Sequence, residues 1–220
     1  KILDRTSGTA AGDLSSILID NMPFWADYSS TPGNEVALMA EWETKMPAIV
    51  QETITENVTS LAGVPSWMMV LLNEVLETTG KESILEVWPQ MEVFFHGGVS
   101  FDPYVEQYKK LLPIGDIKYY ETYNASEGFF AIQDRNNSKE LLLMLDYGIF
   151  YEFISMKTYE TPEEKIIPLN EVELGENYAI IITTNAGLWR YKIGDTVRFT
   201  SKSPYRIKVS GRTKHHINVF

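Results

Sequence analysis

The chain has 220 residues, of which 19 are Lys or Arg and 30 are Asp or Glu, so its formal net charge is −11. The length suits one ordinary domain or two small ones, and a hydrophobic content of 44% supports a real core, which excludes wholesale disorder. The absence of Cys excludes a disulfide scaffold and a Cys nucleophile. The presence of only three His disfavours a zinc enzyme. The negative net charge disfavours nucleic-acid binding.

The first third of the chain predicts helices and a short buried strand. Residues 35–58 have the apolar spacing of a helix, with a kink or break expected at Pro47. Residues 59–64 predict a strand. Pro65 then suits the first position of a helix that closes at Gly80.

The same alternation continues toward the middle of the chain. Residues 91–95 predict a second buried strand that runs into Gly97-Gly98, and residues 101–112 predict a helix. Residues 117–121 predict a third strand. Strands separated by helices indicate a parallel sheet.

After Gly128 the pattern changes to short apolar runs separated by turn signals, which predicts antiparallel β structure in a small barrel or sandwich. We therefore expect an α/β part with a partly parallel sheet and flanking helices over residues 1–134. An antiparallel β-barrel-like subdomain should follow over residues 135–212.

Ligands of open α/β sheets bind beyond the carboxyl ends of the strands, which directs attention to three segments. They are Gly63–Pro65, His96–Ser100 and Tyr123–Glu127. Glycines after a strand admit a flat ligand or a phosphate, or simply form a tight turn. A Tyr, a Ser and a Glu together can stack on a base, bond a phosphate and hold Mg²⁺, or form an aromatic strand end with a polar turn.

The C-terminal end is basic in an otherwise acidic chain. Residues 1–100 carry 4 basic and 14 acidic side chains, whereas residues 189–220 carry 8 basic ones and only Asp195 as an acid. Asp195 follows a Gly and could accept both hydroxyls of a ribose, or mark an ordinary hairpin turn. Arg212 and Lys214 offer cations to a phosphate or carboxylate, although a solvated strand face explains the charge equally well.

Four motifs fall in an order that resembles one enzyme superfamily. The series HGGVS, YNASEG, YKIGD and GRTK is similar to the adenylate-forming superfamily, and within it the chain resembles the bacterial branch of the auxin-responsive GH3 family. Stretches such as LAGVPSWMMVLLNEVLE and GLWRYKIGDTVRFTS carry this resemblance, which runs from about Asp13 to Phe220. By contrast, Ser7–Gly12 looks like a phosphate loop only superficially, since it lacks the Lys.

The resemblance implies a nucleotide site. Tyr123 would stack on adenine, with Gly97 and Gly98 lining the same pocket. Asp195 would hold the ribose hydroxyls, and Arg212 would sit near the ribose or the phosphate.

The resemblance also implies residues for the phosphate, the metal and the acid. Ser126 would contact the α-phosphate of ATP, Glu127 would bind Mg²⁺, and Lys214 would fall at a hinge that begins near residue 213 and spans 213–220. The acyl-acid pocket would be bordered by Val64, Pro65 and Trp67.

The implied activity is that of an acyl-acid amido synthetase. A carboxylic acid would be activated by Mg·ATP to an acyl-adenylate, and an amino acid would then displace AMP to form an amide. The family's upstream phosphate loop and its C-terminal domain have no counterpart here, so we expect an internal piece with little activity of its own.

Two other hypotheses remain beside the enzyme. The chain could be a catalytically silent nucleotide- or acyl-binding module, or an interaction fragment whose exposed surface favours a homodimer. No apolar run reaches the roughly 18 residues needed to span a bilayer. Without a signal peptide, a cytoplasmic location without membrane partners is expected.

Overall fold

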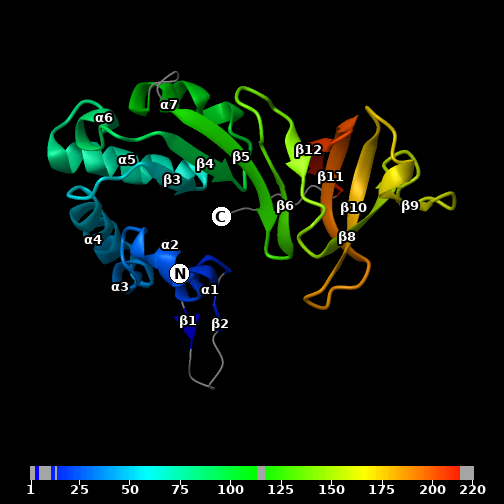
Figure 1. Ribbon diagram of the computed structural model, residues 1–220, viewed down its shortest axis with the longest axis horizontal. Helices are drawn as coiled ribbons and strands as arrows, with labels where there is room; N and C mark the ends of the chain where they lie inside the picture. Colours follow the sequence, from blue (N-terminus) through cyan, green and yellow to red (C-terminus); the bar gives the residue numbers. More distant parts are fainter. Residues whose placement is uncertain (1–2, 5–10, 13, 113–116, 214–220) are drawn as a thin grey trace. The chain divides into compact units, whose positions relative to one another are not determined.

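The chain folds into two compact units, Lys1–Lys118 and Tyr119–Phe220. The computed structural model describes residues 3–4, 11–12, 14–112 and 117–213 (Figure 1). The expected boundary after residue 134 falls inside the second unit, because the strands just before it supply side chains to that unit's core.

The N-terminal unit is mainly helical. Its helices are α1 (Leu14–Asp20), α2 (Phe24–Tyr28), α3 (Asn34–Ala37), α4 (Trp42–Thr53), α5 (Pro65–Thr79), α6 (Ile84–Val87), the 3₁₀ turn η1 (Asp102–Tyr104) and α7 (Val105–Leu111). Its strands are β1 (Leu3–Asp4), β2 (Ala11–Gly12), β3 (Ser60–Gly63) and β4 (Val93–Gly97).

Strands β3 and β4 pair in parallel, from Ser60 opposite Val93 to Gly63 opposite His96, with α5 and α6 between them in the chain. This confirms the parallel pairing predicted from the alternation of strands and helices. Two parallel strands run in the same direction, so the chain must return to the starting end of the sheet before the second strand begins. A tight turn is too short for that return, and a helical crossover provides it.

The caps of α5 follow local sequence signals. Pro65 occupies the first turn, where its missing N–H costs no helical hydrogen bond, and Gly80 ends the helix with φ +65° and ψ 21°. Leu72 and Val75 are completely buried on the inner face. The predicted helix is confirmed at both ends.

The break in the helical region of residues 35–58 does not fall at Pro47. The helical region is interrupted at residues 38–41, between α3 and α4, whereas Pro47 lies inside α4. A proline removes one backbone hydrogen bond. The buried side chains of Met46 and Val50 hold α4 in place on either side of that position.

The C-terminal unit is built almost entirely from antiparallel strands. In chain order they are β5 (Lys118–Ala125), β6 (Gly128–Ile132), β7 (Leu141–Leu143), β8 (Ile149–Ser155), β9 (Ile166–Pro168), β10 (Asn177–Thr184), β11 (Tyr191–Lys202) and β12 (Tyr205–Arg212), with a 3₁₀ turn η2 (Leu169–Glu171) after β9. Neighbours in the sheet follow the order β5-β6-β7-β12-β11-β10-β8-β9.

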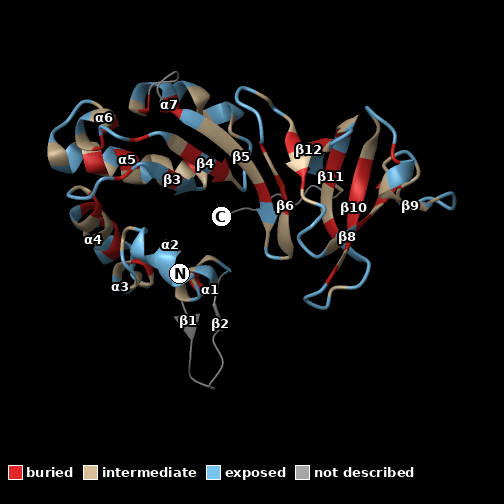
Figure 2. Ribbon diagram, in the orientation of Figure 1, coloured by how far each residue is buried: buried red, intermediate tan, exposed pale blue. Residues whose placement is uncertain are grey.

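This sheet curls around one core. Phe130 on β6 and Tyr151 on β8 have ring centroids 6.5 Å apart, although β7, β12, β11 and β10 lie between their strands in the sheet. Phe153 and Phe199, both fully buried, meet edge to face at 5.0 Å in the same core. Buried residues are concentrated in these strands (Figure 2), and most of them belong to this one core, as the predicted barrel-like subdomain requires. A smaller buried cluster of Ile154, Ala179 and Ile181 lies apart from it.

Strand β5 is longer than the predicted strand at 117–121. It continues to Ala125, which places Tyr123 inside the strand and leaves Ser126 and Glu127 as the turn into β6. Antiparallel pairing of Ala125 with Gly128 extends the ladder to this turn.

Within the described ranges, no helix combines the length and the apolar character required to cross a membrane.

Candidate functional site

Asp195 lies where β11 passes beside the end of β12. It follows Gly194, whose φ of +84° favours glycine, and it faces Arg212 directly across the two strands. The Nε atom of Arg212 lies 3.1 Å from Oδ1 of Asp195. The Arg212 side chain is 58% exposed, so its guanidinium remains accessible to an anion.

The second oxygen of Asp195 is bound from the interior of the unit. The hydroxyl of Tyr123 donates a hydrogen bond of 2.9 Å to Oδ2. The residue is 8% exposed, and its ring packs against Phe130 with centroids 5.0 Å apart. Burial and then the neighbouring Asp195 carboxylate raise the pKa of Tyr123, which keeps the phenol protonated and able to donate.

Glu127 borders a cavity of about 430 Å³ in the C-terminal unit, and Ser126 precedes it in the turn after β5. Its lining comes from the turn after β5, the segment before β8 and the end of β10, and consists of Glu127, Gly128, Phe129, Tyr147, Ile149, Thr184, Asn185 and Ala186. The rings of Phe129 and Tyr147 lie 5.9 Å apart. The cavity thus joins an aromatic wall to a carboxylate and an amide, which suits a partly apolar ligand with polar groups.

Glu127 is the predicted metal ligand. Among the residues that the structure describes, no group of three or more His, Asp or Glu could hold a metal ion. A single carboxylate still fits Mg²⁺ that arrives with a nucleotide, because Mg²⁺ usually keeps several waters and takes one or two carboxylates plus phosphate oxygens.

The predicted acid-pocket residues gather in the N-terminal unit at the carboxyl ends of β3 and β4. Gly98 has φ +81°, and a Cβ built on it would lie 3.4 Å from Cγ2 of Val64. Pro65 accepts a 2.7 Å hydrogen bond from the Tyr108 hydroxyl at its carbonyl, which fixes the start of α5. The ring of Trp67 is exposed and meets that of Trp42 at 5.1 Å.

His96 belongs to the core rather than to an open surface. It is 3% exposed, and its ring stacks on Phe101 with centroids 4.1 Å apart. Burial lowers the pKa of His96 to about 4, so the imidazole is neutral at physiological pH. It can shape the turn at Gly97-Gly98 without adding a positive charge to it.

The structure therefore brings together Tyr123, Asp195 and Arg212 in the C-terminal unit, and Val64 and Gly98 in the N-terminal unit. Gly97 is the last residue of β4 in the N-terminal unit, two residues beyond the end of the predicted strand 91–95. Lys214 lies outside the described residues.

Sequence reasoning missed most of the cavity beside Glu127. The turns at 146–148 and 185–187 are visible as Gly-containing signals, but no local pattern says that Tyr147 and Asn185 line the same cavity.

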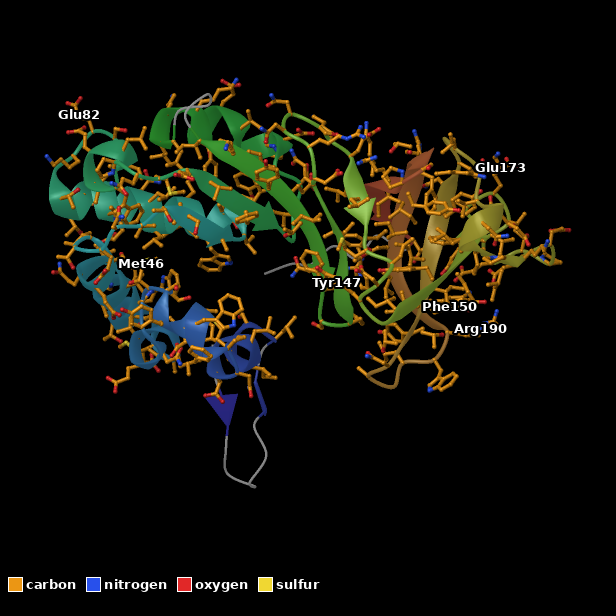
Figure 3. The ribbon with its side chains drawn as sticks, viewed as in Figure 1. Met46, Glu82, Tyr147, Phe150, Glu173 and Arg190 are labelled. Atoms are coloured by element: carbon orange, nitrogen blue, oxygen red, sulfur yellow. The ribbon has the colours of Figure 1, made fainter. Side chains whose placement is uncertain are left out.

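The sequence analysis also missed an ion pair near that end of the unit. Arg190, at φ +44°, donates to Glu152 from Nε at 2.9 Å and from Nη2 at 2.7 Å. Figure 3 shows Arg190 beside Phe150 near β8.

Comparison with protein families gives two matches that together cover most of the chain. Residues 1–116 match the GH3 family N-terminal domain, and residues 142–212 match the GH3 family central domain.

Individual relatives are plant enzymes. The chain is 28% identical over 124 residues to "Indole-3-acetic acid-amido synthetase GH3.3" of Arabidopsis thaliana, which covers 53% of this chain and 20% of that protein. It is 33% identical over 107 residues to "Jasmonoyl--L-amino acid synthetase JAR4" of Nicotiana attenuata, covering 45% of this chain and 18% of that protein. The matches thus span about a fifth of these relatives' lengths.

Solved structures share the fold. A structure described as "AtGH3.15 acyl acid amido synthetase in complex with 2,4-DB" matches with a TM-score of 0.66 and 16% identity, covering 84% of this chain and 42% of that one. A 2-hydroxyisobutyryl-CoA ligase in complex with 2-HIB-AMP and CoA matches with a TM-score of 0.58 and 16% identity, covering 82% and 42%. The fold is that of these ligase chains.

Proposed function

This chain belongs to the GH3 family, and from that premise we propose that it forms part of an ATP-dependent acyl-acid amido synthetase. The proposed reaction joins a small carboxylic acid to an amino acid. The relatives named for indole-3-acetic acid and jasmonoyl conjugation support this reaction class.

In the first step, a carboxylate oxygen of the acid attacks the α-phosphorus of ATP, and pyrophosphate leaves. In the second step, the amine nitrogen attacks the acyl carbon, AMP leaves, and the amine loses a proton to solvent. Mg²⁺ supplies charge neutralisation on the phosphates when bound, and Glu127 is the proposed residue to hold it.

The nucleotide contacts are divided among the residues at strand ends. Asp195 accepts the ribose hydroxyls, and the exposed guanidinium of Arg212 meets the ribose or the phosphate. Ser126, in the turn beside Glu127, meets the α-phosphate. The ring of Tyr123 is one proposed adenine contact, and Gly97 and Gly98 are proposed as further adenine contacts.

The acid is proposed to lie against Val64, Pro65 and Trp67, and Lys214 to mark the hinge that precedes a mobile domain. A cytoplasmic location and self-association into a dimer are further proposals. Both rest on composition and exposed surface.

The observation that carries the proposal is the Asp195 carboxylate, held by Tyr123 and by Arg212 where β11 passes beside the end of β12. A carboxylate offers about four acceptor sites, so two partners leave capacity for two ribose hydroxyls. A catalytically silent nucleotide-binding module would use the same contacts and is the second candidate. The cavity beside Glu127 favours the enzyme, because it places space for a second ligand next to the proposed metal ligand.

The test is calorimetric titration of the 220-residue chain with AMP and Mg²⁺. We expect a dissociation constant in the micromolar-to-millimolar range, on the order of −8 to −4 kcal/mol. Asp195→Asn should weaken binding about tenfold or more, since it removes a charge-assisted hydrogen-bond acceptor.

The matched control is Glu163→Gln, which makes the same carboxylate-to-amide change at an exposed loop position. It should leave AMP affinity unchanged. An Asp195→Asn chain that is folded and binds AMP as tightly as the parent would contradict the proposed ribose contact.

A further inference from the structure

We propose that the hydroxyl of Tyr123 is a positioning group that acts through Asp195, holding its carboxylate in the orientation that accepts a ribose diol. This inference deepens the proposed nucleotide site and rests on it. It concerns the hydroxyl alone and is independent of any stacking by the ring.

The first support is the path of the hydrogen bond. Tyr123 is on β5 and Asp195 is on β11, and β6, β7 and β12 lie between these strands in the sheet. The bond of 2.9 Å thus crosses the interior of the curled sheet and joins positions 72 residues apart. Such a link restrains the Asp195 position of β11 from inside the sheet, in addition to the contact that Arg212 makes from the neighbouring strand β12.

The second support is the division of the Asp195 oxygens. Oδ2 accepts from the Tyr123 hydroxyl, and Oδ1 lies 3.1 Å from Nε of Arg212. With a partner on each oxygen in the unliganded chain, rotation about the Cβ–Cγ bond disturbs both contacts. The orientation of the carboxylate plane is therefore defined before a ligand arrives. This lowers the entropic cost of ordering the side chain on binding.

The third support is the different burial of the two partners. The Tyr123 ring is held in the core, whereas the Arg212 side chain is 58% exposed. An exposed arginine can leave Asp195 for a phosphate, but the buried phenol cannot. Burial and the Asp195 charge both raise the pKa of Tyr123, so the phenol stays protonated across the working pH range.

Tyr123→Phe isolates the hydroxyl, because the phenyl ring keeps the packing and any stacking. Tyr151→Phe is the matched control. Tyr151 is 4% exposed in the same core, and its hydroxyl has no hydrogen-bond partner within the described part of the chain. Both variants lose one buried hydroxyl, and only one of those hydroxyls contacts Asp195.

The probes are AMP and 2′,3′-dideoxy-AMP, each titrated with Mg²⁺. The parent chain should prefer AMP, because only AMP offers the diol that Asp195 accepts. Tyr123→Phe should reduce that preference by about fivefold or more, as expected for loss of a hydrogen bond to a charged group. Its affinity for dideoxy-AMP should stay within about twofold of the parent's, while Tyr151→Phe should keep the parent's preference.

Two results would overturn the inference. An unchanged preference in Tyr123→Phe would mean that the hydroxyl has no role in ribose recognition. Equal weakening of both nucleotides would mean that the change acts on the ring site or on the fold, and not through Asp195.

A separate arm requires no nucleotide. Free energies of unfolding in urea for Tyr123→Phe, Asp195→Ala and the double variant should be non-additive, since both single changes remove the same hydrogen bond. Additive free energies would overturn the positioning role even if AMP binds. The parent chain could fail to bind AMP while the unfolding free energies are non-additive. That result would contradict the proposed nucleotide function and would still support the role of the Tyr123 hydroxyl in positioning Asp195.

Discussion

Arg206 is a buried cation in the β barrel-like unit. It is 4% exposed, lies on β12 and is paired with Asp134, which receives a 3.2 Å hydrogen bond from Nε and a second one from Nη2. A guanidinium taken out of water needs such a bidentate partner, because an unpaired buried charge is strongly unfavourable. The pair fixes the loop after β6 against β12.

Asp134→Asn should lower the free energy of unfolding by about 1 kcal/mol at pH 7. Charge-assisted hydrogen bonds contribute about 1.5–3 kcal/mol when buried, and the Asp134 side chain is 26% exposed, which reduces the effect. The hydrogen bond from Arg206 lowers the pKa of Asp134 below its usual 3.8. Its contribution is therefore complete above that value and is lost as pH falls through the lower folded-state pKa.

The measurement is urea unfolding of parent and Asp134→Asn between pH 7 and pH 2. The difference between them should shrink only below about pH 4. Glu106→Gln is the control, since this carboxylate pairs with Lys109 but is 80% exposed. A difference that stays constant down to pH 2 would show that the ionised carboxylate is not what stabilises the fold.

Local chemistry decides how well each site residue could be foreseen. The motif order placed Tyr123, Ser126, Glu127, Asp195 and Arg212 near strand ends. It did not reveal that Tyr123 and Asp195 touch, because their hydrogen bond joins positions 72 residues apart and no sequence period reports it. The cavity residue Tyr147 was missed for the same reason.

At the scale of elements, helix α5 was the most predictable because both of its ends carry their own signals. The helix does not break at Pro47, since the burial of Met46 and Val50 in α4 outweighs the local preference of proline. Strand β5 was predicted too short, because its last residues pair with β6 and their strand character depends on that partner.

The end of α5 supplies the second stability prediction. Gly80 has φ +65°, and no atom lies within 4 Å of the position where a Cβ would stand, so a side chain there meets backbone strain and not a clash. Gly80→Ala should reduce the free energy of unfolding by about 1 kcal/mol. Gly80→Asn should cost less, because Asn adopts the left-handed region more readily.

Thermal and urea unfolding of the two variants against the parent provide the measurement. The order parent, Asn, Ala in decreasing stability is the expected outcome. Equal stability of the Ala variant and the parent would show that the helix end relaxes to another conformation at no cost.

At the scale of the whole molecule, net charge opposes compactness. The chain carries −11 at neutral pH, and its acidic residues dominate the first hundred positions. Ion pairs among the described residues could offset this repulsion, but most include an exposed lysine, and Lys157 at 78% and Lys165 at 76% are the most exposed of these. Pairs of that kind contribute about 0–1 kcal/mol each.

Repulsion should therefore outweigh exposed ion pairing, and the urea midpoint should rise when NaCl increases from 0.01 to 0.15 M. Over that range the screening length falls from about 30 Å to about 8 Å, which removes repulsion across the molecule while leaving buried contacts such as Arg206–Asp134 almost unaffected.

Sucrose is the control for a general solvent effect, because it stabilises the folded state without screening charge. It should raise the urea midpoint by an amount that does not depend on pH. The NaCl effect should instead vanish near pH 4.8, where the net charge is close to zero. A midpoint that falls with salt at pH 7 would show that the ion pairs stabilise the chain more than its net charge destabilises it.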